Sequence, residues 1–196
     1  MGTARQNATK AQARGAQLEA ELEHWHTIWR RQGKADMRRI KAPVNIIGSL
    51  GRGQFRAVLN GEAHVDFEGV LRGGLSVCFD AKHVERGASF ALSQLRDNQL
   101  VYLSQRARFG AVAFVFVRRH SSPGQPQRDY VLPVDGSGRI AGLAHERMGL
   151  ERGQETPVKS VRFEDLEAVG LCGPWVDVVE AAIEAGRWPG VIAGRS

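Results

Sequence analysis

Cysteine is scarce in this chain: there are two among 196 residues, Cys78 and Cys172. Two thiols cannot build a disulfide framework, so the sequence excludes the small disulfide-stapled secreted proteins, and we expect both thiols to stay reduced. No run of 18 apolar residues is present, which excludes a transmembrane helix. The first 15 residues also lack the apolar stretch of a secretory signal. We therefore expect a cytoplasmic protein with no membrane partner.

Acidic residues are scarce in the N-terminal part of the chain. Up to Arg56 there are eleven Lys or Arg but only four Asp or Glu, whereas the remaining residues carry sixteen basic and seventeen acidic side chains. The net charge of +6 is therefore concentrated at one end. A one-sided basic region favours a polyanionic partner, most often nucleic acid. A basic tail that only aids solubility is the alternative.

Apolar residues make up 42% of the chain, enough for one globular domain with a core. We expect a disordered basic tail over residues 1–13 and a single domain over 14–196. Within that domain Leu18, Leu22, Trp25 and Trp29 recur at helical spacing and predict a helix over 16–32. His26 falls on the adjacent polar stripe.

The rest of the domain alternates strands and helices. The Gly-rich segment GSLGRGQFR at 48–56 predicts a flexible loop or hairpin tip, and it lacks the Gly-Lys-Ser/Thr ending of a nucleotide P-loop. Further patterns predict strand character over 56–70 around an Asn-Gly turn, and strands at 44–47, 75–82, 110–120 and 130–134. They also predict a helix at 89–107, a loop at 136–156, and helices at 161–170 and 175–186. Pro133 indicates an edge strand or the end of a strand. This order predicts an α/β fold with a central mixed sheet flanked by helices.

The stretch VDFEGVLRGGLSVCFDAKHV places three charged residues in a β-prone apolar frame: Asp66, Asp80 and Lys82. Strand alternation puts Asp80 and Lys82 on one face, and a hairpin around the Gly-Gly turn brings Asp66 near Asp80. A buried charge is unfavourable unless it is compensated. Two carboxylates bind a hard cation such as Mg²⁺ or Mn²⁺, and a nearby lysine reaches the water or phosphate oxygen. The pattern indicates a metal-dependent nuclease.

Other interpretations of these residues remain open. Asp80 and Lys82 together make an ordinary ion pair if the strand lies at an edge, and Glu68 shares a strand face with Asp66 and is an alternative ligand. His24 and His26 diverge by roughly 200° on a helix, so a shared ion is not expected. His83 points away from Lys82.

Several ordered segments resemble one known family. ARGAQLEAEL is similar to an Arg-Gly-x-x-Leu-Glu helix, IKAPVNII to a Lys-x-Pro-x-Pro-Val segment lacking its first proline, and SFALSQLRDNQLVYL to a Ser-Phe-Pro-Leu…His-Gln…Leu helix. Together with the Asp66–Lys82 block, these resemble the RecU-type Holliday junction resolvases of the PD-(D/E)xK nuclease superfamily. The resemblance extends from about residue 14 to 184 and implies a restriction-endonuclease-like fold.

The resemblance also implies a role for each matching residue. Asp66 is the implied first metal ligand and Asp80 the second, where the family usually has glutamate. The carbonyl of Ala81 completes the coordination of Mg²⁺, for which Mn²⁺ can substitute, and Lys82 orients the water or stabilises the developing negative charge. Glu19 matches a helix acid that contacts a metal-bound water or a second metal.

On the DNA side, Gln99 matches the Gln of the family's His-Gln pair and supports the site or touches DNA. The family's members are homodimers with a stalk that enters the junction, and residues 48–60 correspond to it here. Arg52 and Arg56 would contact junction phosphates. From their charge alone we expect Arg38, Arg39 and Lys41 to meet the phosphate backbone.

These patterns lead to three hypotheses. The first is a structure-selective, metal-dependent endonuclease that resolves four-way DNA junctions in recombination and repair, acting as a dimer. The second is a nuclease of the same superfamily that acts on another DNA form. The third is a DNA-binding recombination accessory protein without catalytic activity.

Overall fold

The computed structural model describes residues 2–61, 63–120, 126–140 and 159–189, with the backbone alone for 2–11. In chain order the elements are α1 (Gly2–Arg31), β1 (Ala35–Arg39), β2 (Val44–Gly51), β3 (Gln54–Leu59), β4 (Phe67–Leu71), β5 (Ser76–Val84), β6 (Ser89–Ala91), η1 (Leu92–Gln94), α2 (Asp97–Arg108), β7 (Val112–Arg119), β8 (Arg128–Pro133), β9 (Ser160–Arg162), α4 (Phe163–Ala168) and α5 (Trp175–Glu184). None of the described helices is long and apolar enough to cross a membrane.

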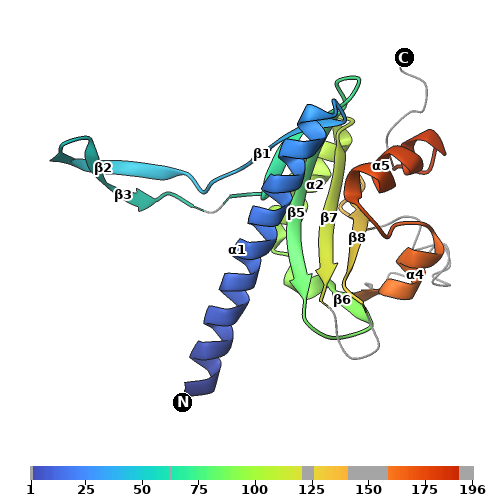
Figure 1. The fold of residues 1–196 in the computed structure, drawn as a ribbon, viewed down its shortest axis with the longest axis horizontal. Coiled ribbons are helices and arrows are strands. Elements are labelled where there is room, and N and C mark those ends of the chain that lie inside the picture. The colour runs from blue at the N-terminus through green and yellow to red at the C-terminus, as the bar shows by residue number, and fades with distance from the viewer. Residues whose placement is uncertain (1, 62, 121–125, 141–158, 190–196) are drawn as a thin grey trace.

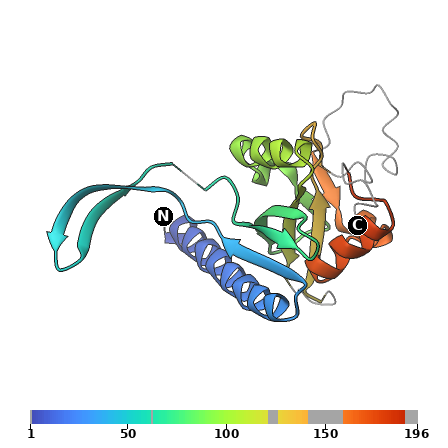
Figure 2. The same cartoon turned by 90° about the horizontal axis from the view of Figure 1, so that it is seen from above.

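A five-stranded mixed sheet in the order β1-β4-β5-β7-β8 forms the centre of the molecule. The strands β5 and β7 run parallel, and the other neighbours are antiparallel. Helices α1 and α5 cover one face of the sheet and α2 covers the other (Figures 1 and 2). The predicted α/β fold is thereby confirmed, including the interior position of β7 and the edge position of β8 with its Pro133.

The hairpin β4–β5 forms around the predicted turn, with Phe67 opposite Phe79 and Gly69 opposite Val77. Strand β1, which the sequence patterns did not reveal, pairs with the other edge of β4. It passes so close that a Cβ atom on Gly69 would overlap the Asp36 carbonyl oxygen and lie 2.7 Å from the Met37 Cα. Only glycine fits at this position of the strand.

Helix α1 begins at Gly2, whereas the sequence led us to expect a disordered segment before residue 14. The first turns are rich in alanine and free of proline, a composition that favours helix once the following turns are packed. At the other end Gly33 adopts a φ of 65°, and the amides of Gly33 and Lys34 bond the carbonyls of Arg30 and Trp29. This is the glycine-based ending common in α-helices.

The buried stripe of α1 differs from the predicted one at a single position. Leu18, Leu22, His26 and Trp29 are buried, while Trp25 is 47% exposed and stacks on Trp29. The prediction of a polar stripe through His26 was wrong. At 3.6 residues per turn, Trp25 lies about 40° from the centre of the stripe formed by Leu18, Leu22 and Trp29, and His26 about 60°, so helical periodicity does not explain the difference. The imidazole is the side chain that tertiary packing buries. It packs edge-on against the rings of Phe67, Phe79 and Trp175.

The helix predicted over 89–107 is wrong in its first part. Residues 89–91 form β6, which pairs with β9, and helix α2 begins only at Asp97. The pairing partner is far away along the chain, so local periodicity contains no sign of it. Much of the loop predicted at 136–156 lies outside the described residues.

The hairpin β2–β3 projects away from the body of the protein (Figures 1 and 2). Every residue of both strands is exposed. Its tip is Gly51-Arg52-Gly53, all three with positive φ, as the Gly-rich sequence predicted for a hairpin tip. Burial of this ribbon against another surface would be needed to stabilise it, since isolated two-stranded hairpins are marginal in water.

The buried imidazole of His26 makes the fold sensitive to acid. Burial lowers the pKa of His26 from 6.5 to about 4, so the unfolded chain binds an extra proton between those values. Stability is therefore complete above pH 6.5 and falls as the pH drops towards 4, by about 3 kcal/mol at most. Urea unfolding at a series of pH values from about 7.5 down to about 4.5 measures this slope. The slope should flatten in His26→Leu, and an equal slope in both proteins would contradict the assignment.

Candidate active site

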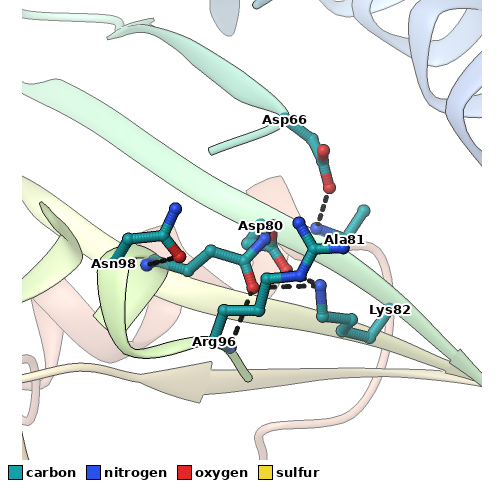
Figure 3. A network of polar contacts seen from close by, with 7 residues as sticks. Asp66, Asp80, Ala81, Lys82, Arg96 and Asn98 are labelled. Atoms are coloured by element: carbon teal, nitrogen blue, oxygen red, sulfur yellow. Dashed lines mark hydrogen bonds and ion pairs between the residues drawn. The ribbon is translucent and has the colours of Figure 1, made fainter. Parts of the chain in front are cut away.

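Asp80 and Lys82 lie side by side on the inner strand β5, facing helix α2 (Figure 3). Asp80 is fully buried, and its Oδ2 lies 2.6 Å from Lys82 Nζ. Alternation along the strand puts both on the face opposite Phe79, as the sequence predicted. The alternative of an exposed ion pair on an edge strand does not hold, because β5 lies between β4 and β7.

Gln99, in the first turn of α2, holds both members of this pair. Its Nε2 donates to Asp80 Oδ1 at 2.6 Å, and its Oε1 accepts from Lys82 Nζ at 3.3 Å and from the Arg96 amide at 3.2 Å. The single amide thus fixes the carboxylate, the ammonium and the start of the helix. The expectation that Gln99 supports the site agrees with this geometry.

Asp66 enters the site from the residue before β4. Its Oδ2 accepts the Ala81 amide at 2.7 Å, while its own carbonyl accepts the Ile40 amide at 2.8 Å. These bonds tie Asp66 to the middle of β5 and to the chain after β1. The register of Phe67 with Phe79 then leaves the Asp66 and Asp80 carboxylates as neighbours.

The electrostatics of the site follow from burial. Removal from water raises the pKa of Asp80 from 3.8 to about 7, the Asp66 carboxylate contributes in the same direction, and the Lys82 ammonium opposes both. Two carboxylates crowded in a dry site repel one another. A divalent cation between them would relieve that repulsion.

The oxygen donors present fit a hard divalent cation. Among the described residues Asp80 Oδ2 is buried and accepts no hydrogen bond besides its ion pair with Lys82, so a second lone pair is left for a cation. The described part of the chain contains no group of three or more His, Cys, Asp or Glu close enough to hold a metal. Two carboxylates with a backbone carbonyl nonetheless suit Mg²⁺, which commonly takes one or two carboxylates and fills its shell with water and substrate phosphate.

Glu19 lies on α1 beside this cluster but has a partner of its own, the guanidinium of Arg39. Burial raises the pKa of Glu19, with Arg39 opposing and the nearby Asp66 charge adding to the rise. The structure therefore brings Glu19 within electrostatic reach of Asp66. The ion pair therefore links Arg39, which the sequence predicts to contact phosphate, to Glu19, which the sequence predicts to act in catalysis.

The other predicted DNA contacts lie outside the site. Arg38 and Lys41 are on and just after the edge strand β1, and Arg52 and Arg56 are exposed on the projecting hairpin. The basic residues therefore follow a path from the sheet edge out along the ribbon. That distribution suits an extended polyanion more than a small anion.

The alternative ligands are engaged elsewhere. Glu68 accepts the Tyr102 hydroxyl and pairs with Arg106 at 3.2 Å, both on α2. His26 is in the apolar core, and His83 packs against His120 on the other side of the strand. The sequence patterns did not reveal the Glu68 network, although Gln99, Tyr102 and Arg106 recur at i, i+3 and i+7 and so share one face of α2.

Comparison with known proteins identifies a family that this chain matches. The chain matches the family described as Recombination protein U, RecU, over residues 13–135. It belongs to the RecU family. The matched segment contains every candidate site residue, from Glu19 to Gln99, together with the whole projecting hairpin.

Two curated RecU relatives illustrate the similarity. A protein of Staphylococcus aureus named Holliday junction resolvase RecU is 27% identical over 111 residues, which cover 54% of this chain and 52% of the relative. A Geobacillus protein of the same name is 30% identical over 111 residues, which cover 54% of each chain. The chain therefore spans about half the length of the curated relatives it matches.

Replacing Asp80 with asparagine tests the electrostatic assignment. The pKa of this group is about 7 in the folded state against an ordinary value of 3.8, so the wild type is free of the penalty below pH 3.8 and loses stability as the pH rises to 7. Asp80→Asn should therefore gain melting temperature relative to the wild type as the pH rises from about 4 to about 7.5. Each kcal/mol of unfolding free energy that the wild type loses corresponds to a difference of about 2–4 °C. A difference that stays constant with pH would contradict the burial of a charge at this position.

Proposed function

We propose that this protein is a Holliday junction resolvase: a metal-dependent endonuclease that recognises four-way DNA junctions and hydrolyses phosphodiester bonds. The observation that carries the proposal is the Asp66, Asp80 and Lys82 set, held in the middle of the sheet beside Gln99. The names of its RecU relatives support the choice of substrate. The path of basic residues along the projecting hairpin suits a branched DNA.

In the proposed mechanism the carboxylates of Asp66 and Asp80 and the carbonyl of Ala81 hold Mg²⁺, with Mn²⁺ able to substitute. When bound, such an ion polarises the phosphoryl oxygen and lowers the pKa of water. Lys82 orients the attacking water and stabilises the charge that develops on phosphate. Gln99 keeps Asp80 and Lys82 at fixed separation, and Glu19, held by Arg39, contributes a further acid next to Asp66.

The DNA contacts in this proposal come from two places. Arg38, Arg39 and Lys41 meet the phosphates beside the site, and Arg52 and Arg56 meet them along the hairpin. Arg52 adopts a φ of 52°, a conformation that asparagine or glycine would tolerate better. The positive side chain at the tip is therefore retained at some cost in stability, which supports a functional role.

A homodimer is the second part of the proposal. Cross-strand partners share a face of a ribbon, so Val44, Ile46, Phe55 and Leu59 form one face, and Arg56 lies on the other. The four apolar side chains of the first face are 56–73% exposed. We infer that a second copy covers this apolar face and leaves the face with Arg56 to DNA.

With both thiols free, we place the protein in the cytoplasm.

Cleavage of a labelled four-way junction, beside linear duplex of the same sequence, tests the activity. In Mg²⁺ or Mn²⁺ the wild type should nick strands of like polarity symmetrically in the junction alone. Asp80→Ala and Lys82→Ala should each reduce the rate at least about 100-fold, because each removes a group that acts on the reacting phosphate.

Glu184→Ala is the matched control, since it removes an exposed acid of α5 on the other face of the sheet. Equal cutting of linear duplex would refute selectivity for four-way junctions and would favour a nuclease that acts on another DNA form. Tight junction binding without cutting by the wild type would favour the accessory protein and refute the enzyme.

Neighbouring residues of β3 separate the two faces of the hairpin. Phe55→Asp puts a charge on the apolar face and should convert the dimer to a monomer in light scattering. Arg56→Gln, on the opposite face, should leave the mass unchanged and weaken junction binding, with the slope of log K against log salt reduced by about 0.9 for each phosphate that the arginine neutralises. An unchanged mass for Phe55→Asp would rule out dimerisation through this face.

A further inference from the structure

The chain that joins the projecting hairpin to the site is short and is held at both ends. At the hairpin, the Asn60 amide bonds the Pro43 carbonyl at 2.8 Å and its side chain bonds Asn45 at 3.2 Å. At the site, Asp66 is bonded to Ile40 and Ala81. Only a few residues of the chain therefore separate the hairpin from Asp66.

Within this connection one side chain reaches across to helix α2. The ring of His64 stacks on that of Tyr102, with centroids 5.3 Å apart and planes 9° from parallel. His64 itself is exposed, so the stack contributes little to the core. It joins the segment before Asp66 to the helix that holds Gln99.

Tyr102 is in turn fixed to the sheet. Its hydroxyl donates to Glu68 on β4, and Arg106 pairs with the same carboxylate while its guanidinium lies 5.4 Å from the centre of the Tyr102 ring. Burial, together with the 15% exposed Glu68 carboxylate, raises the pKa of Tyr102 to about 12. The phenol therefore stays a hydrogen-bond donor.

These contacts form a continuous path around the site. One branch runs from the hairpin directly to Asp66. The other runs from His64 to Tyr102 and along one turn of α2 to Gln99, which holds Asp80 and Lys82. The bond to Ala81 and the β4–β5 register set the relative position of Asp66 and the Asp80–Lys82 pair, and the ring stack adds a second link, between the segment before Asp66 and the helix that holds Gln99.

We propose that His64 and Tyr102 are positioning residues, whose stacked rings couple the placement of the hairpin on DNA to the geometry of the three candidate catalytic residues. The inference rests on the proposed nuclease function. It assigns neither ring a contact with the reacting phosphate. Displacements of about 1 Å in a reacting constellation reduce rates by up to about 100-fold, so a stack between these rings is sufficient to matter.

Single-turnover cleavage and junction affinity, measured separately, test this role. Affinity is measured in Ca²⁺ and the cleavage rate at saturating protein in Mg²⁺, well below the melting temperature. His64→Ala should bind the junction within about twofold of the wild type yet cleave at least about tenfold more slowly. His64→Phe, which restores a stacking ring, should recover most of the rate.

Two further variants make the test specific. Tyr102→Ala should be at least as slow as His64→Ala, because it also removes the bond to Glu68, and the double variant should be no slower than Tyr102→Ala, because the stack is already lost. Val101→Ala, an exposed neighbour on α2, is the control and should behave as the wild type.

Each outcome has a distinct meaning. If the wild type cleaves and His64→Ala cleaves equally fast, or loses affinity in proportion to rate, the coupling is refuted while the nuclease stands. Additive losses in the double variant would also refute it. If the wild type cleaves no DNA, the proposed function itself fails.

Discussion

A carboxylate buried in the middle of a sheet imposes its requirements on everything around it. Asp80 is removed from water, where an unpaired charge is strongly unfavourable. Lys82 supplies the opposite charge and Gln99 a hydrogen bond, and the Asp66 carboxylate stands close enough to work against both. The arrangement gives up stability at neutral pH and keeps an oxygen atom available. Such a sacrifice is characteristic of sites that bind metal or perform chemistry.

One face of the sheet forms the apolar core and the other forms the polar site. Towards α1 and α5 the sheet presents Phe67, Phe79 and Phe114, a cluster that packs on Trp175 and supplies the apolar burial that stabilises the fold. Towards α2, β5 presents Asp80 and Lys82, which belong to an ordered polar network (Figure 3). Period-two alternation in β5 thus lets one strand serve the core and the site at once. Burial on the apolar face offsets the electrostatic strain on the other.

The sequence was most informative where the rules are local. Strand alternation located Asp80 and Lys82 on one face, and the Gly-rich segments predicted the turns, including the tip that holds Arg52. It failed where partners are distant: β6 needs β9, and the burial of His26 needs α5. Glu68 was considered as a ligand because its strand face is correct. Only the tertiary structure revealed that Tyr102 and Arg106 engage it.

The measurement that most directly tests the central claim is X-ray diffraction from crystals soaked in Mn²⁺, with an anomalous difference map recorded at the manganese absorption edge. A single strong peak between the carboxylates of Asp66 and Asp80, beside the Ala81 carbonyl, is predicted, and it should vanish in Asp80→Ala crystals. A peak that lies elsewhere, or persists when Asp80 is removed, would contradict the assignment of this buried carboxylate as the metal-binding centre.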